Sequence, residues 1–139
     1  DAIRAGIALV PENRKYDGLF FNFRAAGNIT AASLAGLSRF GILNLKAEQD
    51  ATRDLIRDLE ISSQAEEKTV NFLSGGNQQK IVIARWLFSD SEILILDEPT
   101  QGIDIGAKIA VYKLMNKLTR AGKSIILISF VYNGKELQK

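Results

Sequence analysis

The stretch from Ile93 to Thr100 reads Ile-Leu-Ile-Leu-Asp-Glu-Pro-Thr and predicts a buried strand that ends in two carboxylates. A run of large aliphatic residues without alternation is typical of a parallel strand covered on both faces. Asp97 and Glu98 follow at its carboxyl end, where open α/β sheets bind ligands. Neighbouring side chains on a strand point to opposite faces, so one acid can hold Mg²⁺ while the other polarises an attacking water. An Asp-Glu pair alone would more often be a turn or a helix cap.

Two other apolar runs predict further strands. The first, Ile7–Val10, ends at Pro11, because proline cannot donate to a strand ladder. The second covers Ile125–Ser129. Because helical patterns separate the three strands, the sequence predicts an α/β fold on a partial parallel sheet.

Three segments have the three- and four-residue apolar spacing of helices: 47–60, 77 to about 89, and 106–120. The second helix is expected to carry Ile81, Ala84, Leu87 and Phe88 on one side. Gly122 stands where a helix end favours a left-handed residue, so Gly122-Lys123-Ser124 is interpreted as a helix end that leads into a strand.

The region between Gly18 and Thr69 interrupts this pattern and is interpreted as a helical insertion, with short helices expected to begin at Asn28 and Ser38. It contains four large apolar residues in close succession, Leu19, Phe20, Phe21 and Phe23. These side chains either fill the core of the insertion or form a contact surface. Because four such residues cannot all point inward on a regular backbone, some are expected to be exposed.

Composition excludes several kinds of chemistry. The chain has 139 residues, 46% of them hydrophobic, which is enough for one modest core. Its 18 Lys+Arg and 16 Asp+Glu leave a net charge of +2, which does not favour a nucleic-acid partner. With no Cys and no His, disulfides, thiolate chemistry and the commonest metal ligands are excluded. No apolar run is long enough to span a membrane, and no signal peptide is present.

Ser74, Gly75 and Gly76 precede the second predicted helix. Adjacent glycines allow a ligand to approach the backbone closely, and the first N–H groups of a helix attract anions. The turn therefore suits contact with a phosphate. An isolated Ser-Gly-Gly would more often be an ordinary N-cap with flexible glycines.

Taken in order, Leu-Ser-Gly-Gly, a helix, Ile-Leu-Ile-Leu-Asp-Glu-Pro-Thr and Gly-Ile-Asp resemble the ATPases of ABC transporters, which have a P-loop NTPase fold with a helical subdomain. The resemblance implies that Ser74–Gly76 form the signature motif, that Asp97 is the Walker B aspartate and binds Mg²⁺, and that Glu98 is the catalytic glutamate. Residues implied to contact ATP are Ser74, Gly75, Gly76, Asn77, Gln78, Glu12 and Asp104, the last in a D-loop that begins at Gln101.

Two further blocks look like the second cassette of the fused ATPases that drive ribose, galactose and xylose import. One is Asn77–Lys80, followed by Ala84–Leu87, and the other is Ala8–Lys15, which resembles a Q-loop region with Glu12 in place of the usual Gln. The resemblance divides the chain into residues 1–18 (core strand and Q-loop), 19–90 (helical subdomain with the signature motif) and 91–139 (core strands, Walker B and D-loop).

The family's phosphate-binding Walker A pattern, Gly-x-x-x-x-Gly-Lys-Ser/Thr, is absent from this sequence. In the resembling proteins that loop lies upstream of the position of Asp1, and the chain is therefore expected to be an excised piece that does not bind or hydrolyse ATP by itself. Phe130 stands where many ABC ATPases have a switch His, and no function is assigned to the tail that follows Ser129.

The leading hypothesis is part of the ATP-hydrolysing subunit of a sugar importer, attached to the cytoplasmic face of the membrane. The resemblance implies a second cassette packed head to tail, permease subunits, and indirectly a sugar-binding protein as partners. The alternatives are an ABC ATPase of DNA repair or translation, and an interaction module that has lost catalysis. Apolar edges at 7–10 and 93–96 are expected to favour self-association.

Overall fold

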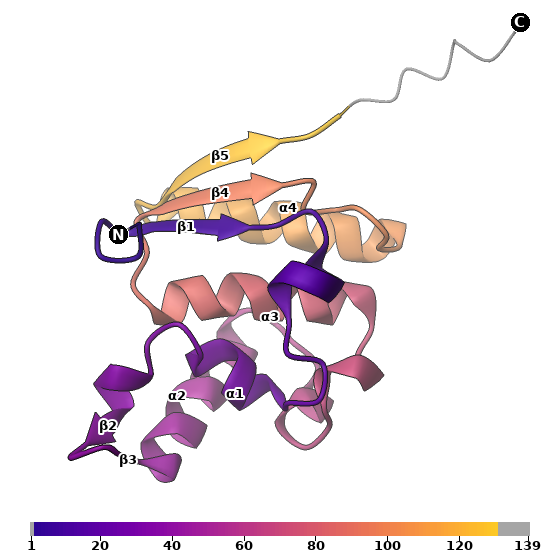
Figure 1. The fold of residues 1–139 in the computed structure, drawn as a ribbon. Helices are drawn as coiled ribbons and strands as arrows, with labels where there is room; N and C mark the ends of the chain where they lie inside the picture. The colour runs from indigo at the N-terminus through magenta and orange to yellow at the C-terminus, as the bar shows by residue number, and fades with distance from the viewer. Residues whose placement is uncertain (1, 131–139) are drawn as a thin grey trace, which may run out of the picture.

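The computed structural model describes residues 2–130, and a three-stranded parallel sheet forms one of its layers (Figure 1). The strands are β1 (Ile7–Val10), β4 (Ile93–Asp97) and β5 (Ser124–Ile128), in the spatial order β1-β4-β5. Leu9 is paired with Ile95, which is paired in turn with Ile126. The three predicted strands and their parallel arrangement are confirmed.

The other elements are helices, single turns and one hairpin. In chain order they are η1 (Arg14–Gly18), α1 (Ala25–Thr30), η2 (Leu34–Leu37), β2 (Ser38–Arg39), β3 (Ile42–Leu43), α2 (Leu45–Asp58), η3 (Ser63–Glu66), η4 (Val70–Phe72), α3 (Gly75–Phe88) and α4 (Ile105–Arg120). The predicted helices over 47–60, 77–89 and 106–120 are confirmed as α2, α3 and α4, although α3 begins two residues earlier, at Gly75. The second strand of the hairpin leads directly into α2, whose N-cap Asn44 accepts a hydrogen bond from the Ala47 amide at 3.1 Å.

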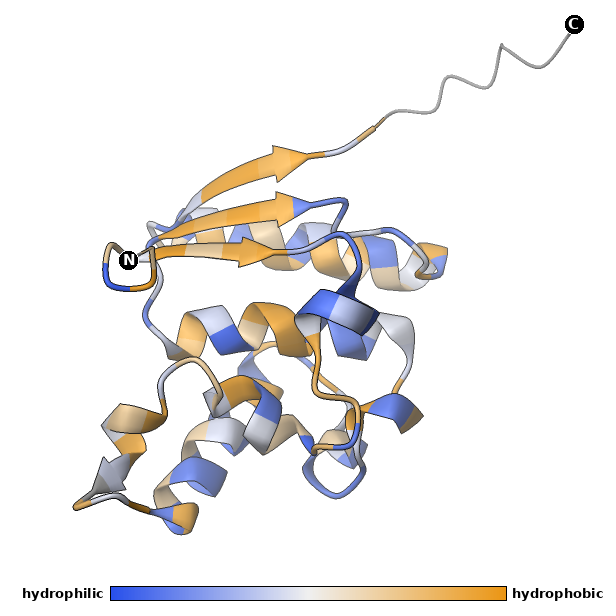
Figure 2. Ribbon diagram, viewed as in Figure 1, coloured by the Kyte–Doolittle hydropathy of each residue, from blue (hydrophilic) through white to orange (hydrophobic). Residues whose placement is uncertain are grey.

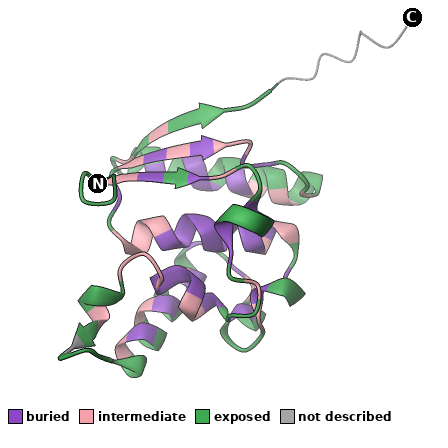
Figure 3. Cartoon of the chain, viewed as in Figure 1, coloured by how far each residue is buried: buried purple, intermediate pink, exposed green. Residues whose placement is uncertain are grey.

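The helices cover only one face of the sheet. Ala8, Val10, Leu94 and Leu96 alternate toward that face and are buried. The strands are apolar along their length (Figure 2), but parts of β1 and β5 are exposed (Figure 3). On the face opposite the helices, Leu9 and Ile126 are 51% and 52% exposed. Within residues 2–130 no second layer packs against this side, so β1 and β5 are not covered on both faces, whereas Ile93 and Ile95 of β4 are half-buried there.

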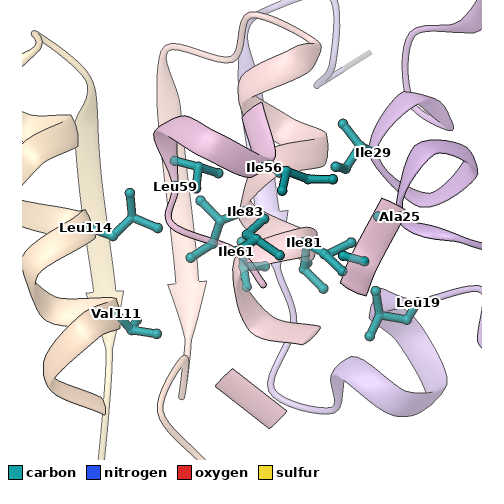
Figure 4. Packing of buried hydrophobic residues seen from close by; sticks show 14 of the residues in the cluster. Leu19, Ala25, Ile29, Ile56, Leu59, Ile61, Ile81, Ile83, Val111 and Leu114 are labelled. Atoms are coloured by element: carbon teal, nitrogen blue, oxygen red, sulfur yellow. The ribbon is translucent and has the colours of Figure 1, made fainter. Parts of the chain in front are cut away.

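Helix α3 lies at the centre of the molecule and is buried around its whole circumference from Gln78 to Arg85. Figure 4 shows Ile81 and Ile83 of this helix among apolar side chains of α1, α2 and α4. Burial on this helix is therefore not confined to the side that carries Ile81 and Ala84. Its polar residues are also buried, because the insertion packs against the side of the helix that faces away from the sheet.

The prediction of helix starts at Asn28 and Ser38 is also wrong. Helix α1 begins at Ala25, and the Asn28 side chain is buried, where its amide nitrogen donates to the carbonyls of Phe20 (3.0 Å) and Arg24 (3.1 Å). Ser38 begins the β2-β3 hairpin, whose turn has left-handed backbone at Phe40 (φ 52°) and Gly41 (φ 78°). Local composition did not indicate this hairpin.

Strand β4 is not an edge strand, which corrects the expectation of an uncovered edge at residues 93–96. It lies between β1 and β5, so that both of its edges are paired. Across residues 2–130, the helices are too short or too polar to cross a bilayer.

Candidate functional site

The loops that carry the predicted site residues gather at one end of the molecule. The carboxyl ends of β1 and β4 and the N-termini of α3 and α4 all lie at this end (Figure 1). The loop after β4 contacts both the loop after β1 and the start of α3, as the hydrogen bonds and close approaches below show. The sequence-predicted residues are therefore neighbours in the fold.

Ser74 is the N-cap of α3 and is exposed. Its Oγ accepts hydrogen bonds from the backbone N–H of Asn77 at 3.4 Å and from the Asn77 side-chain amide at 3.0 Å. The Asn77 side chain also accepts from the Ser62 amide at 3.0 Å, which ties the helix start to the end of the insertion. Ser74 is thus an N-cap. Its hydroxyl lies at the surface, beside the first N–H groups of a 14-residue helix.

Gln78 is buried and shapes the turn from within. Its amide nitrogen donates to the carbonyls of Val70 (3.0 Å) and Leu73 (3.1 Å), the residues that lead into the turn. In this conformation its side chain supports the backbone of the Ser74 turn and does not reach the surface.

Close packing within the molecule leaves little room for a side chain at either glycine of the turn. A Cβ on Gly75 would lie 2.8 Å from Nη2 of Arg14 and 3.0 Å from Cγ2 of Ile103. A Cβ on Gly76 would lie 2.5 Å from the Cβ of Ala107 in α4. The sequence pattern indicated that these glycines let a ligand approach the backbone. The structure shows that they also let α3 pack closely against Arg14, Ile103 and Ala107.

Asp97 and Glu98 are half-buried at the end of β4, as predicted. The backbone of Glu98 is left-handed (φ 42°), and its amide donates to the carbonyl of Ile128 at 2.9 Å. Its carboxylate accepts a hydrogen bond from the amide of Phe130. No group of three potential metal ligands is found in the described part of the chain. A lone carboxylate such as Asp97 nevertheless suits Mg²⁺, which keeps several waters and takes one or two carboxylates together with substrate phosphates.

Glu12 and Asp104 lie on the loops that flank this end of the sheet. Glu12 is exposed and accepts a hydrogen bond from Nε2 of Gln101 at 2.9 Å, which joins the loop after β1 to the loop after β4. Asp104 caps α4 by accepting from the Ala107 amide at 2.9 Å. In this structure Asp104 therefore acts as the N-cap of α4.

Sequence reasoning missed Arg14, which is only 8% exposed. Its Nη1 donates to the carbonyl of Gln101 at 2.8 Å and its Nη2 to the carbonyl of Gly102 at 3.2 Å. Burial lowers the pKa of the guanidinium below its ordinary value. Pro-Glu-Asn-Arg-Lys has the composition of a solvated turn, so no local signal could have shown that this arginine is buried.

Gly122, Lys123 and Ser124 form a helix end, which confirms the prediction. Gly122 has left-handed backbone (φ 91°) after α4, and β5 begins at Ser124. Lys123 pairs with Glu92 at 3.0 Å and with Asp90 at 3.3 Å, and the hydrogen bond that its ammonium donates to Glu92 is the main cause of its raised pKa. This tripeptide therefore connects α4 to β5, at the end of the sheet opposite Asp97.

Comparison with known proteins identifies relatives of this chain. A family model described as "ABC transporter" matches residues 1–101. The ribose import ATP-binding protein of Oceanobacillus iheyensis is 47% identical over 129 residues, which are 93% of this chain and 26% of that protein. A ribose import ATP-binding protein of Streptomyces avermitilis is 44% identical over 128 residues, 92% of this chain and 24% of that protein. The chain thus spans about a quarter of the length of the curated relatives it matches.

Solved structures provide an independent comparison of the fold. A dimeric ATP-binding cassette in a post-hydrolysis state, bound to ADP and phosphate, superposes with a TM-score of 0.70 at 23% identity, covering 91% of this chain and 53% of that one. A second dimeric structure, of a bacterial ABC transporter cassette, gives a TM-score of 0.68, also at 23% identity, and covers 90% of this chain and 52% of that one. At this identity the likeness concerns the fold.

Proposed function

The chain belongs to the ABC transporter family, and we propose from this premise that it forms part of an ATP-hydrolysing subunit that powers the import of a sugar. Its α/β fold is that of the ATP-binding cassettes, which are P-loop NTPases. The observation that carries the proposal is the convergence of the Ser74 turn and the Asp97-Glu98 strand end at one end of the molecule. Relatives that align with 93% of this chain are named as ribose import ATP-binding proteins. This similarity favours a role in transport over a role in DNA repair or translation.

ATP with Mg²⁺ would supply the γ-phosphate whose transfer to water releases the energy for transport. Ser74 offers its exposed hydroxyl, and Gly75 and Gly76 offer the backbone of a helix N-terminus, to phosphate oxygens presented by a second cassette. Asn77 orients Ser74 through the 3.0 Å hydrogen bond, and Gln78 holds the turn from inside.

At the nucleotide site of its own cassette, Asp97 would hold Mg²⁺ and Glu98 would polarise the attacking water, whereas Ser74 would serve the nucleotide of the second cassette. Glu12 would reach the same ion or water from the loop after β1, where its carboxylate is already directed at Gln101. Asp104 would face the second cassette from the start of α4. These roles rest on the family resemblance, and the half-buried strand end and exposed loops described above support them.

We assign residues 19–90 to a helical subdomain and place the contact with the permease on its aromatic residues. Leu19 is buried and Phe21 is half-buried, whereas Phe20 and Phe23 are 52% and 57% exposed, with ring centroids 5.8 Å apart. The expectation that some of these side chains remain exposed is confirmed. An exposed aromatic pair suits a protein partner, which would hold the subunit at the cytoplasmic face of the membrane.

A chimera tests the catalytic assignment. This chain replaces the aligned segment of the Oceanobacillus iheyensis relative, in which the Walker B glutamate of the other cassette has been changed to Gln, so that any remaining hydrolysis reports the site containing Glu98. Glu98→Gln should slow hydrolysis by about a hundredfold or more with nearly unchanged ATP affinity, because it removes the base but keeps the shape. Asp97→Asn should instead weaken Mg²⁺-dependent binding. Glu67→Gln, on the exposed surface, is the matched control.

Absence of hydrolysis in the unsubstituted chimera, or equal effects of Glu98→Gln and Asp97→Asn on ATP affinity, would overturn this division of roles. In the same chimera with its permease, Phe20→Ser with Phe23→Ser should abolish sugar uptake while ATP hydrolysis persists. Loss of folding would instead favour a core role for the two rings.

A further inference from the structure

The loop after β1 is joined to the loop after β4 by side chains that lie far apart in the sequence. Arg14 donates to the carbonyls of Gln101 and Gly102, 87 and 88 positions away, at 2.8 and 3.2 Å. The Gln101 side chain returns a hydrogen bond to Glu12, 89 positions away, at 2.9 Å. Three hydrogen bonds therefore fasten the loop that begins at the catalytic strand end onto the loop after β1.

The same guanidinium lies against the start of α3. Its Nη2 would be 2.8 Å from a Cβ on Gly75, and the carbonyl of Gly102 would be 3.3 Å from that Cβ. The Gln101–Gly102 turn and the first residue of α3 thus approach each other through Arg14, and a side chain at position 75 would displace the guanidinium.

Stability alone does not account for this arginine. It is 8% exposed, its guanidinium is hydrogen-bonded to backbone carbonyls and not to a carboxylate, and its Nε has no hydrogen-bond partner. Burying a cation without a carboxylate beside it costs free energy. A role in positioning the loops explains why this cation is buried here. The planar guanidinium presents two parallel donors to two successive carbonyls, which a lysine ammonium does not reproduce.

We propose that Arg14 is a positioning residue that fixes the Gln101–Gly102 turn against Gly75 and so sets the Ser74 turn relative to the Asp97-Glu98 strand end. The proposal rests on the proposed function, because one side chain then joins the turn that serves the second cassette's nucleotide to the strand end that serves the chain's own. Glu12 supports the bridge from the exposed side through Gln101.

The first test requires no activity. In the 139-residue chain, Arg14→Met keeps the aliphatic stem and removes the guanidinium. The ¹⁵N order parameters of Gln101, Gly102 and Gly75 should fall from about 0.85, typical of rigid backbone, to below about 0.6, while those of α2 remain unchanged. Arg4→Met, at the exposed turn before β1, is the matched control and should change none of them. Unchanged values at all three residues in Arg14→Met, or a uniform fall across the chain, would overturn the proposal.

The second test measures catalysis in the chimera described above. Arg14→Met should lower kcat at least tenfold and change the Kd for Mg-ATP less than twofold, because it displaces the loops without removing a ligand contact. Methylguanidinium should restore part of kcat in Arg14→Ala, and methylammonium should not, since only the former has paired donors. If Arg14→Met is poorly folded, Arg14→Lys is compared with the unsubstituted chimera and should also lose kcat.

The outcomes separate the two proposals. If Glu98→Gln abolishes hydrolysis but the Arg14 variants retain full kcat, the positioning role is wrong and the proposed function stands. If Glu98→Gln has no effect while Arg14→Met loosens Gln101 and Gly75, the bridge is present in the fold but the catalytic assignment fails.

Discussion

Gly76 of α3 packs directly against Ala107 of α4: a methyl group on Gly76 would lie 2.5 Å from the Cβ of Ala107. Carbon atoms do not approach this closely without displacement, so the two helices reach their observed separation because position 76 has no side chain. The contact lies one turn or less from both helix starts, where the candidate site is formed.

Gly76→Ala should therefore destabilise the chain, even though alanine is the better helix former. We expect a net loss of about 1–2 kcal/mol in the free energy of unfolding, because overpacking outweighs the gain in helix propensity. Chemical denaturation measures it. Gly76→Ala combined with Ala107→Gly should recover most of the loss, and a double variant no more stable than Gly76→Ala alone would show that the steric explanation is wrong.

Asn28→Ala should be among the most destabilising polar substitutions. Asn28 is fully buried, and Arg85 donates to its backbone carbonyl at 2.7 Å and to its side-chain oxygen at 3.2 Å, while the Phe20 amide donates to the same side-chain oxygen at 2.8 Å. Removing the side chain leaves donors of Phe20 and Arg85 without this acceptor, which should cost at least about 2 kcal/mol. Thermal unfolding checks this, with the exposed Asn22→Ala as control; equal losses would contradict it.

The Lys123 ion pairs should produce a small, salt-sensitive stabilisation. The pKa of Lys123 is raised above its ordinary value of 10.5, so its contribution is present below that pH and is lost as the pH rises through the higher folded value. Because Asp90 and Glu92 are exposed, Lys123→Met should cost less than about 1 kcal/mol. Denaturation at pH 8 should show this difference, and 1 M NaCl or pH above the folded pKa should remove it. A difference that grows with pH would contradict the assignment.

The uncovered face of the sheet should make the chain associate with itself. Leu9 and Ile126 are about half-exposed on that face, and in residues 2–130 the outer edge of β5 has no strand beside it. Light scattering should give a mass that rises with concentration, and Leu9→Lys with Ile126→Lys should reduce it toward the monomer. Tyr112→Lys on α4 is the control. A strictly monomeric chain at high concentration would refute this prediction.

The 139-residue chain alone should not bind Mg-ATP measurably. Its sequence contains no Walker A pattern, and the Ser74 turn by itself offers few phosphate contacts. Isothermal titration calorimetry with Mg-ATP should show no heat of binding, and a micromolar Kd would be incompatible with the expectation. The same titration of the Asp97→Asn variant is the control: any heat that it lacks would come from Mg²⁺ binding at Asp97.

Local patterns were sufficient to predict β1, β4, β5 and the helices α2, α3 and α4, because strand and helix periodicities are set by neighbouring residues. The same holds for the residue types of the candidate site, since Ser74, Asp97 and Glu98 stand at element ends that these patterns locate. The hairpin at Ser38 was missed because its turn depends on left-handed backbone at Phe40, a residue type that rarely signals it.

The order of the strands, the burial of Arg14 and the contact of Gly76 with Ala107 were decided only by the tertiary structure. Each depends on segments separated by tens of residues, and periodicity carries no information about which distant segment becomes a neighbour. Arg14 is the clearest case: its surroundings in the sequence are polar, and only the approach of Gly75 and the Gln101–Gly102 turn removes its guanidinium from water.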